Sequence, residues 1–203
     1  MAEEERLTAI LLGAGLGERM GGPKALLLIT GEPLYLLHAR RAREAGCSDV
    51  VLVTNRNVAS VLPTEPGVRI VLSDEAETSG SLARGCSALG EAGICLITPV
   101  DAVPASVPTI TLLFQTIRDG AEAATPLFLG RGGHPVVCRR DVLLPYFGER
   151  PFPTLRDRLA GLGERRVRVS VTDPNVTLDL DRPADVSALT GAPPAFWKKS
   201  MLR

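Results

Sequence analysis

The sequence carries no net charge and is poor in aromatic and histidine residues. Its 203 residues include 23 Lys and Arg, 23 Asp and Glu and two His, and aromatic side chains make up 4%. A chain whose charges balance has no overall field that would hold it on DNA, RNA or an anionic membrane. We therefore expect no nucleic-acid or membrane partner, and any polyanion must be bound by a local site.

Long apolar runs and a secretory leader are also missing. The first six residues, MAEEER, are acidic where a secretory signal needs a basic segment, and no run approaches the roughly 20 apolar residues that span a bilayer. We therefore expect a cytoplasmic protein. Hydrophobic residues make up 45% of the chain, which is enough to form a core without disulfides or a structural metal.

The cysteines do not form a metal or disulfide pattern. The chain has four, far apart, with no CxxC pair and no His at the spacing of zinc ligands. We expect buried free thiols at Cys47, Cys86, Cys95 and Cys138.

The first half of the chain alternates apolar runs with helix-length segments. Such runs favour strands that are buried on both faces, and strands that alternate with helices indicate right-handed βαβ units. The sequence predicts a single Rossmann-like domain over residues 1–192, an α/β fold with three α/β/α layers and a mostly parallel sheet. The expected strands are Leu7–Leu12, Asp49–Thr54, Val68–Leu72 and Gly93–Thr98, and the expected helices are Pro33–Ala45 and Ser81–Leu89.

The second half has a looser pattern with shorter elements. Turn residues separate the candidate strands Ala123–Leu129, His134–Cys138, Val167–Val171 and Val176–Leu180, and the candidate helices are Thr109–Arg118, Arg140–Phe147 and Thr154–Leu162. Residues 193–203 form a C-terminal tail with the only Trp beside two lysines. We expect this tail to be frayed, with a docking segment as the alternative.

The most informative segment is the loop that follows the first strand. Residues 11–24 read LLGAGLGERMGGPK, with five glycines, one arginine and one lysine. Glycines let backbone N–H groups point into one concavity and approach a phosphate closely. This segment predicts an anion-binding loop.

Two common phosphate-binding loops do not fit this segment. A dinucleotide-binding G-x-G-x-x-G would start at Gly13, but Glu18 occupies the third glycine position, and the second strand ends in Thr54 and Asn55 without an acid. A Walker A loop needs Lys directly after its last glycine, where this chain has Pro23.

A third pattern fits closely. The stretch from Gly13 to Lys24, G-x-G-x-G-x-R-M-G-x-P-K, resembles the signature of the molybdenum cofactor nucleotidyltransferases, which include cytidylyl- and guanylyltransferases. Sugar-phosphate and methylerythritol-phosphate nucleotidyltransferases are more distant relatives by this loop. Further segments resemble the family in the same order along the chain, namely Thr78–Gly85, Leu96–Asp101, Gly133-His134-Pro135 and Leu178–Asp185.

The resemblance implies transfer of a nucleoside monophosphate from a nucleoside triphosphate to a phosphorylated acceptor, with release of pyrophosphate. It implies catalytic roles for Lys24, at the α-phosphate, and for Arg19, at the β- and γ-phosphates. The phosphate groups make a general base unnecessary, because an acceptor phosphate with a second pKa of about 6 is already ionised. The implied nucleotide-binding residues are Leu12, Gly13, Ala14, Gly15, Gly17, Arg19, Lys24, Ser79, Gly80 and Ser81.

The same resemblance implies a divalent cation, Mg²⁺ or alternatively Mn²⁺. Asp101 follows a strand end and is the first ligand, because ligands of open α/β sheets lie beyond the carboxyl ends of the strands. Asp179 and Asp181 occupy alternating positions, so one of them completes the shell. We assign Asp179 to the metal and place Asp181 with His134 on the acceptor side.

The branch of the family is read from a few positions. Pro23-Lys24 and the Gly-His-Pro turn resemble the cytidylyl branch and favour CTP over GTP, with molybdopterin as the acceptor and a molybdoenzyme or chaperone as a possible partner. Departures at Gly13, at residues 102–104 and at Arg182 and Ala184 bear on the acceptor more than on the triphosphate. A non-catalytic cofactor-binding module is the rival of another class, and it predicts loss of Lys24, Arg19 or Asp101, which are all present.

Overall fold

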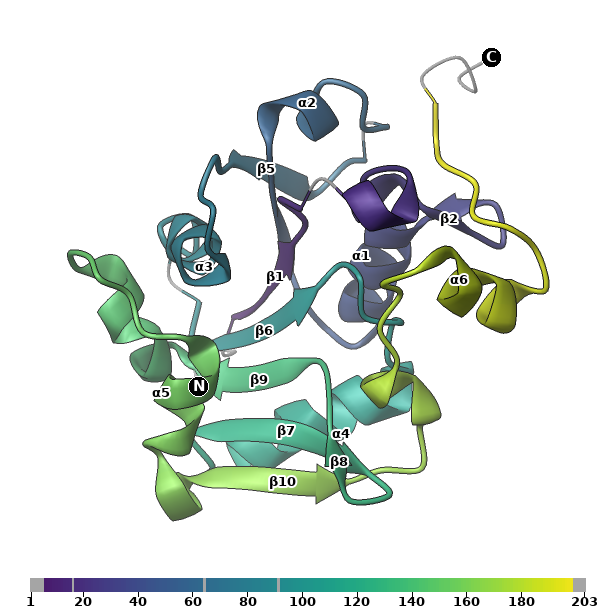
Figure 1. Ribbon diagram of the computed structural model, residues 1–203. Coiled ribbons are helices and arrows are strands. Elements are labelled where there is room, and N and C mark those ends of the chain that lie inside the picture. The colour runs from purple at the N-terminus through teal and green to yellow at the C-terminus, as the bar shows by residue number, and fades with distance from the viewer. Residues whose placement is uncertain (1–5, 16, 64, 91, 199–203) are drawn as a thin grey trace.

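The computed structural model describes residues 6–15, 17–63, 65–90 and 92–198. The acidic residues 1–5 and the end of the tail, 199–203, lie outside the described residues. One large sheet runs through the molecule in the strand order β10-β7-β9-β6-β1-β4-β5, with β8 paired to β7 (Figure 1). Its strands are β1 Leu7–Leu12, β4 Asp49–Thr54, β5 Val68–Leu72, β6 Ile94–Pro99, β7 Ala123–Phe128, β8 Arg131–Gly132, β9 Val136–Arg139 and β10 Arg166–Ser170.

The sheet is mixed but mostly parallel, as predicted. β1 lies between β4 and β6 and is parallel to both, β5 is parallel to β4, and β10 is parallel to β7. β9 runs antiparallel to β6 and β7, so its first residue lies at the edge where the parallel strands end. The carboxyl ends of β1, β4 and β6 and the start of β9 therefore meet at one edge.

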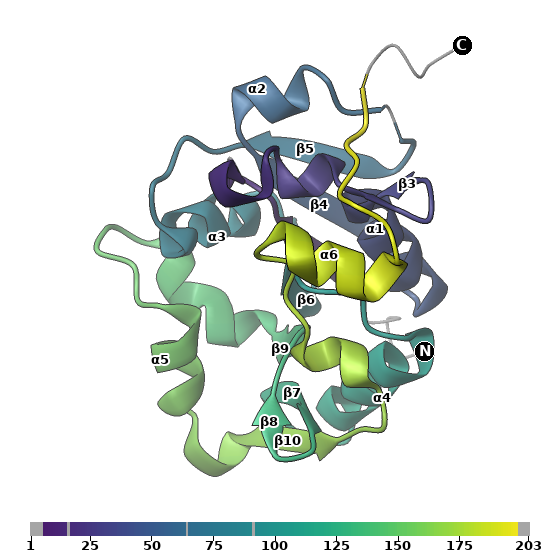
Figure 2. The same ribbon diagram turned by 45° about the vertical axis from the view of Figure 1, so that its right-hand side comes forward.

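Helices cover both faces of this sheet and give the predicted three layers. α1 Leu34–Glu44 and α4 Val107–Arg118 pack on one face, and α3 Thr78–Cys86 and the 3-10 segment η3 Arg140–Phe147 pack on the other (Figures 1 and 2). Short elements complete the fold and are α2 Arg56–Ala59, α5 Leu155–Ala160, α6 Pro183–Thr190, η1 Glu18–Met20, η2 Lys24–Leu26, η4 Gly163–Arg165, η5 Pro174–Thr177, β2 Leu28–Ile29 and β3 Glu32–Pro33.

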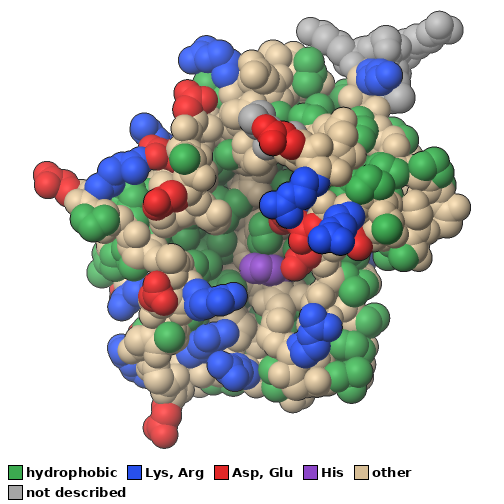
Figure 3. All heavy atoms as spheres, viewed as in Figure 1, with side chains coloured by type: hydrophobic (Ala, Val, Ile, Leu, Met, Phe, Trp, Pro, Cys, Tyr) green, Lys and Arg blue, Asp and Glu red, His purple; other side chains and the backbone are tan. Residues whose placement is uncertain are grey.

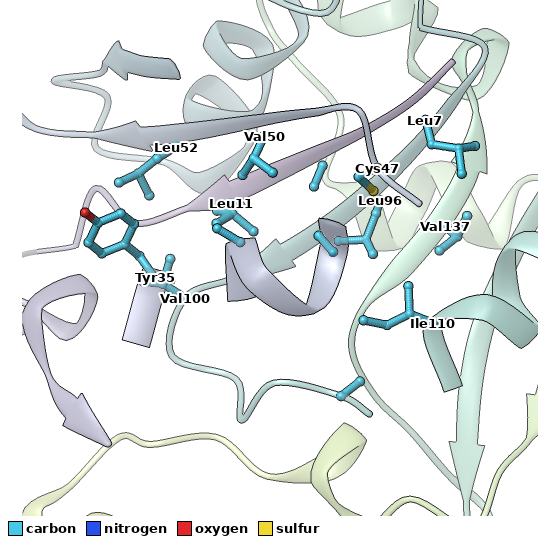
Figure 4. Close-up of a cluster of buried hydrophobic side chains, with 14 of the residues drawn as sticks. Leu7, Leu11, Tyr35, Cys47, Val50, Leu52, Leu96, Val100, Ile110 and Val137 are labelled. Atoms are coloured by element: carbon cyan, nitrogen blue, oxygen red, sulfur yellow. The ribbon is translucent and has the colours of Figure 1, made fainter. Parts of the chain in front are cut away.

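Two apolar clusters hold the layers together. Side chains of β1 and β4 such as Leu11, Val50 and Leu52 are fully buried under α1 (Figure 4). On the opposite face, Ile10 and Val53 pack against α3. Alternate residues of the same strands thus enter opposite clusters, which is why the strand sequences are continuously apolar.

All four cysteines are free and buried, as predicted. Burial raises the pKa of Cys47, Cys86 and Cys95 to about 12, and raises that of Cys138 as well. The thiols are therefore protonated near neutral pH and serve as small core residues.

The predicted strand at Val176–Leu180 is wrong. Asp173 caps a 3-10 turn over Pro174–Thr177 by accepting from the Asn175 N–H, and only an isolated bridge at Asp179 follows. Proline lacks the N–H that a ladder needs, and the Asp side chain satisfies the next N–H locally. The turn therefore replaces the first half of the expected strand.

The described part of the C-terminal tail is docked rather than frayed. Phe196 forms an antiparallel bridge with Leu27, and hydrogen bonds flank the bridge on both sides. The expectation of a frayed segment is therefore wrong for residues 195–197. Within the described residues, no helix combines the length and apolar character needed to cross a bilayer.

Candidate active site

A cleft of about 960 Å³ opens at the edge where β1, β4, β5 and β6 end. The loops that follow these strands line it, together with residues near the start of α3 and Asp181 from the C-terminal part of the chain. Figure 3 shows this hollow, with basic and acidic side chains gathered together at one rim. The topology thus brings the glycine-rich loop and two of the predicted carboxylates, Asp101 and Asp181, to one site, as expected for an open α/β sheet. The third, Asp179, is not among the residues that line the cleft.

The glycine-rich loop leaves β1 by extending its pairing with β4. The Gly13 N–H donates to Val53 O at 2.8 Å, and the side chains of Thr54 and Asn55 donate to the carbonyls of Gly13 and Ala14, each at 3.0 Å. A Cβ at Gly13 would lie 3.2 Å from side-chain atoms of both Leu52 and Val100. These two side chains fill the space beside Gly13 and leave little room for a larger residue there.

The loop then folds back on itself at a glycine. Gly17 has φ +65°, and a Cβ there would lie 2.0 Å from the carbonyl oxygen of Gly22. The Gly22 N–H donates to Gly17 O at 3.3 Å and closes the turn. Within the described part of the chain, no protein group accepts from the N–H groups of Ala14, Gly15 and Gly17. These donors are therefore available to an anion in the cleft.

Lys24 connects three distant parts of the chain. Its ammonium donates to Asp101 Oδ2 at 2.9 Å and to Asp181 Oδ1 at 2.6 Å, and its side chain is 18% exposed. Burial lowers the pKa of Lys24, but the hydrogen bonds and charges of Asp181 and Asp101 outweigh burial, so the pKa rises above its ordinary 10.5. Lys24 is thus a permanent cation at the end of the loop.

The two aspartates meet because the segments that carry them pair with each other. Val103 N–H donates to Leu178 O at 2.8 Å, and Leu180 N–H donates to Asp101 O at 2.7 Å. The hydrogen bond from Lys24 holds the pKa of the Asp181 carboxyl below its usual 3.8.

Asp179 has a different environment from Asp181. Loss of hydration raises the pKa of the Asp179 carboxyl above 3.8, and His134, which is charged only when it is protonated in acid, opposes this rise in part. Asp101 and Asp181 are within electrostatic reach and also raise it. A carboxyl with a raised pKa among other carboxylates is one that a cation would stabilise.

His134 lies beside these carboxylates in a tight turn. Its N–H donates to Val176 O at 2.8 Å, and a Cβ on the preceding Gly133 would lie 1.7 Å from that same oxygen, so only glycine fits there. Burial lowers the pKa of His134, with the charges of Asp179 and Asp101 opposing it. The ring is therefore neutral near pH 7, and its Nδ1 is a buried polar atom without a partner among the described residues.

His38, on α1, is buried and contacts the backbone next to Asp101. Its Nε2 lies 2.9 Å from Ala102 O, next to Asp101. Burial lowers the pKa of His38 to about 4, so the ring is neutral near pH 7. A carbonyl only accepts, so we assign the Nε2 proton to this hydrogen bond. No sequence pattern singles out this role.

The other predicted nucleotide-binding residues are only partly brought together. Leu12, Arg19 and Ser81 line the cleft, whereas Ser79 and Gly80 do not. Ser81 is buried and bonds Ser73 across 3.1 Å. Among the residues that sequence reasoning missed, Asn55 was visible as the polar residue that ends the second strand, and Ser73, Asp74 and Glu75 follow the third strand in the same way.

The sequence of the chain matches the profile of the MobA-like NTP transferase domain over residues 9–169. The chain belongs to this family. The predicted membership in the molybdenum cofactor nucleotidyltransferase group is thereby confirmed, and the protein is a nucleotidyltransferase. The match spans the loop, Lys24 and Asp101, and it ends before Asp179 and Asp181.

Individual relatives of this nucleotidyltransferase agree with that assignment. A molybdenum cofactor guanylyltransferase of Pseudomonas fluorescens is 34% identical over 68% of this chain and 70% of its own length. A protein of the same name from Cupriavidus pinatubonensis is 28% identical over 85% of each chain. The solved structure of an Rv0371c homolog from Mycobacterium sp. strain JC1 has a TM-score of 0.76 at 25% identity, over 92% of this chain and 96% of that chain.

A more distant structure shows the shared fold alone. The 4-diphosphocytidyl-2C-methyl-D-erythritol synthase of Anaerococcus prevotii has a TM-score of 0.72 at 12% identity, over 92% of this chain and 95% of that chain. The fold predicted from the sequence is therefore confirmed by solved nucleotidyltransferases.

Proposed function

We propose that this nucleotidyltransferase transfers a cytidylyl group from CTP to the phosphate of a molybdopterin-type acceptor. The observation that carries the proposal is the meeting of Lys24, Asp101 and Asp181 at the end of the glycine loop. In this reaction an acceptor phosphate oxygen forms a bond to the α-phosphorus, and the bond from that phosphorus to the bridging oxygen of the β-phosphate breaks. Pyrophosphate leaves with the electron pair.

The protein's own groups supply charge and position. The N–H groups of Ala14, Gly15 and Gly17 hold the triphosphate, and Arg19, exposed on η1 and lining the cleft, neutralises the β- and γ-phosphates. Lys24 donates to the α-phosphate, where negative charge develops in the transition state. An incoming triphosphate competes with Asp101 and Asp181 for the Lys24 ammonium. On substrate binding, the ammonium therefore exchanges carboxylate partners for phosphate oxygens.

Asp101 and Asp179 would hold the divalent cation. No cluster of three protein ligands exists among the described residues, but two carboxylates beside a triphosphate site suit Mg²⁺, which keeps phosphate oxygens and water in its shell. When bound, such a cation neutralises charge on the triphosphate and orients it. Mn²⁺ is the alternative, and a solved Rv0371c structure from Mycobacterium tuberculosis, 19% identical, is described as a manganese complex.

The acceptor side is proposed at His134 and Asp181. His134 contributes a partly exposed, neutral ring, which suits contact with a heterocycle. The names of the curated relatives support a molybdenum cofactor precursor as the acceptor. A molybdoenzyme or its chaperone would then receive the product.

Guanylyl transfer from GTP is the second candidate. CTP is supported by Pro23-Lys24 and by the Gly133-His134-Pro135 turn, whereas GTP is supported by the curated relatives, which are named guanylyltransferases. Both candidates use the same loop and the same lysine, and they differ only in the base.

Thermal melting with each nucleotide tests the donor. CTP, GTP, ATP, UTP and NAD are added at about 100 times their dissociation constants, with and without Mg²⁺. Specific binding at that excess adds about 2.7 kcal/mol, a shift of roughly 5–10 °C for a chain of this size. A Mg²⁺-dependent shift led by CTP supports the proposal and one led by GTP selects the second candidate. No shift with any triphosphate contradicts both and favours a non-catalytic module.

A further inference from the structure

The C-terminal segment 193–198 pairs with the residues that directly follow the glycine-rich loop. Leu28 N–H donates to Ala195 O at 2.7 Å, and Trp197 N–H donates to Leu26 O at 2.8 Å. These two bonds flank the bridge between Leu27 and Phe196. The segment thus lies directly beside η2, whose first residue is Lys24.

The Phe196 side chain reaches from this strand to the glycines of the loop. A Cβ on Gly22 would lie 3.0 Å from two ring carbons of Phe196. The ring therefore lies against the Gly22 backbone, two residues before Lys24. Gly22 also donates to Gly17 O, so the same contact supports the turn that forms the anion-binding part of the loop.

Phe196 also packs against a small apolar cluster that joins the loop to the residues after η2. This cluster contains Met20, which is 2% exposed on η1, and Leu27, which is fully buried after η2. Leu180 and Val186 join it from the region that carries Asp181. One apolar cluster therefore connects η1, the residue that follows η2 and the residue that precedes Asp181.

We infer that Phe196 is a positioning residue for Lys24. The ring packs on Gly22 and the backbone of the segment bonds Leu26 and Leu28, so η2 is fixed from both sides and the ammonium is held at one place in the cleft. Phe196 lies outside the match to the family profile, which ends at residue 169. The inference rests on the proposed catalytic role of Lys24.

A double-mutant cycle tests whether Phe196 acts through Lys24. Because a misplacement of about 1 Å costs up to about 10²-fold in rate, Phe196→Ala should lower kcat by about tenfold to a hundredfold. In a Lys24→Ala background, the same change should lower kcat by less than a third of that factor, since the group being positioned is gone. If the factor measured in the Lys24→Ala background is more than a third of the factor measured in the native background, the inference is overturned. Phe196→Leu, which keeps an apolar side chain, should recover most of the rate.

Phe128→Ala is the matched control for a general loss of packing. Phe128 is also a half-buried phenylalanine that packs against the core, but it lies on β7. This variant should lower kcat by the same factor with Lys24 present or absent. If the effect of Phe128→Ala on kcat depends on Lys24 as strongly as the effect of Phe196→Ala does, the inference is overturned.

Hydrogen exchange provides a readout that needs no turnover. In Phe196→Ala, the amides of residues 20–28 should exchange at least about tenfold faster while those of β1 and β4 keep their native rates. Unchanged exchange in residues 20–28 overturns the inference. If the native chain turns over no triphosphate, the proposed function fails, whereas the exchange result still decides whether Phe196 holds the loop.

Discussion

Replacing Lys24 by Met should separate catalysis from stability. Methionine keeps an unbranched apolar stem and removes the charge, so the two carboxylates lose their common donor. The ion pairs are partly open to water, with side-chain exposures of 32% for Asp101 and 61% for Asp181. Water-exposed pairs contribute about 0–1 kcal/mol each, so unfolding should become easier by less than about 2 kcal/mol.

The effect of Lys24→Met on rate should be larger. A donor that acts on charge developing in the transition state is worth about 10²–10³ in kcat, or about 2.7–4 kcal/mol. Single-turnover transfer from an α-labelled triphosphate measures the rate, and urea unfolding of the same sample measures the stability. Nucleotide affinity should fall less than kcat, because the loop N–H groups remain.

Lys198→Met is the matched control for Lys24→Met. Lys198 is exposed and lies outside the cleft lining, so its loss should leave both quantities unchanged. A kcat for Lys24→Met within about threefold of the native value would refute the assignment of Lys24. A loss of rate that is matched by an equal loss of folded protein would refute it too.

Three further changes test the surroundings of Lys24. Gly17→Ala should abolish the nucleotide-dependent melting shift and cost about 1–3 kcal/mol in unfolding free energy, because the methyl group meets Gly22 O and the backbone has positive φ. The pKa of Asp181 is depressed below 3.8, so the stability difference between native and Asp181→Asn should be complete above about pH 5 and vanish toward pH 2 in urea titrations; a difference that grows in acid contradicts this. The pKa of His38 is lowered to about 4, so the free energy of unfolding of the native chain should fall as pH drops from 6.5 to 4. His38→Leu should flatten this dependence. It should also lower the free energy of unfolding at pH 7 by about 1–3 kcal/mol, because the buried Ala102 carbonyl loses its hydrogen bond.

Much of the site was predictable because its signals are local. The apolar run of β1, the glycines after it and the aspartate after β6 each follow from a short stretch of sequence. The rule that parallel strands end at one edge then places Lys24 near Asp101 without knowledge of side-chain contacts. The start of the predicted helix Thr154–Leu162 also follows from a local signal, since Thr154 accepts from the Asp157 N–H at the start of α5.

Other features depend on pairing between distant segments. Residues 178–180 pair with residues 101–103, and this pairing brings Asp181 to Lys24 although the two lie 157 positions apart. The segment around Phe196 follows two prolines and has no alternating pattern of its own. Its hydrogen bonds are all to residues near Leu27, so nothing within the segment predicts its docking.

The most direct test of the account follows the fate of two labels. The native chain is incubated with Mg²⁺, molybdopterin and CTP labelled either at the α- or at the γ-phosphate, with GTP in parallel. The account predicts that the α-label appears in the acceptor product, that the γ-label appears in pyrophosphate, and that Lys24→Met slows both equally. Label transferred from the γ-position to the acceptor, or no transfer from any triphosphate, would contradict the assignment of Lys24 to the α-phosphate.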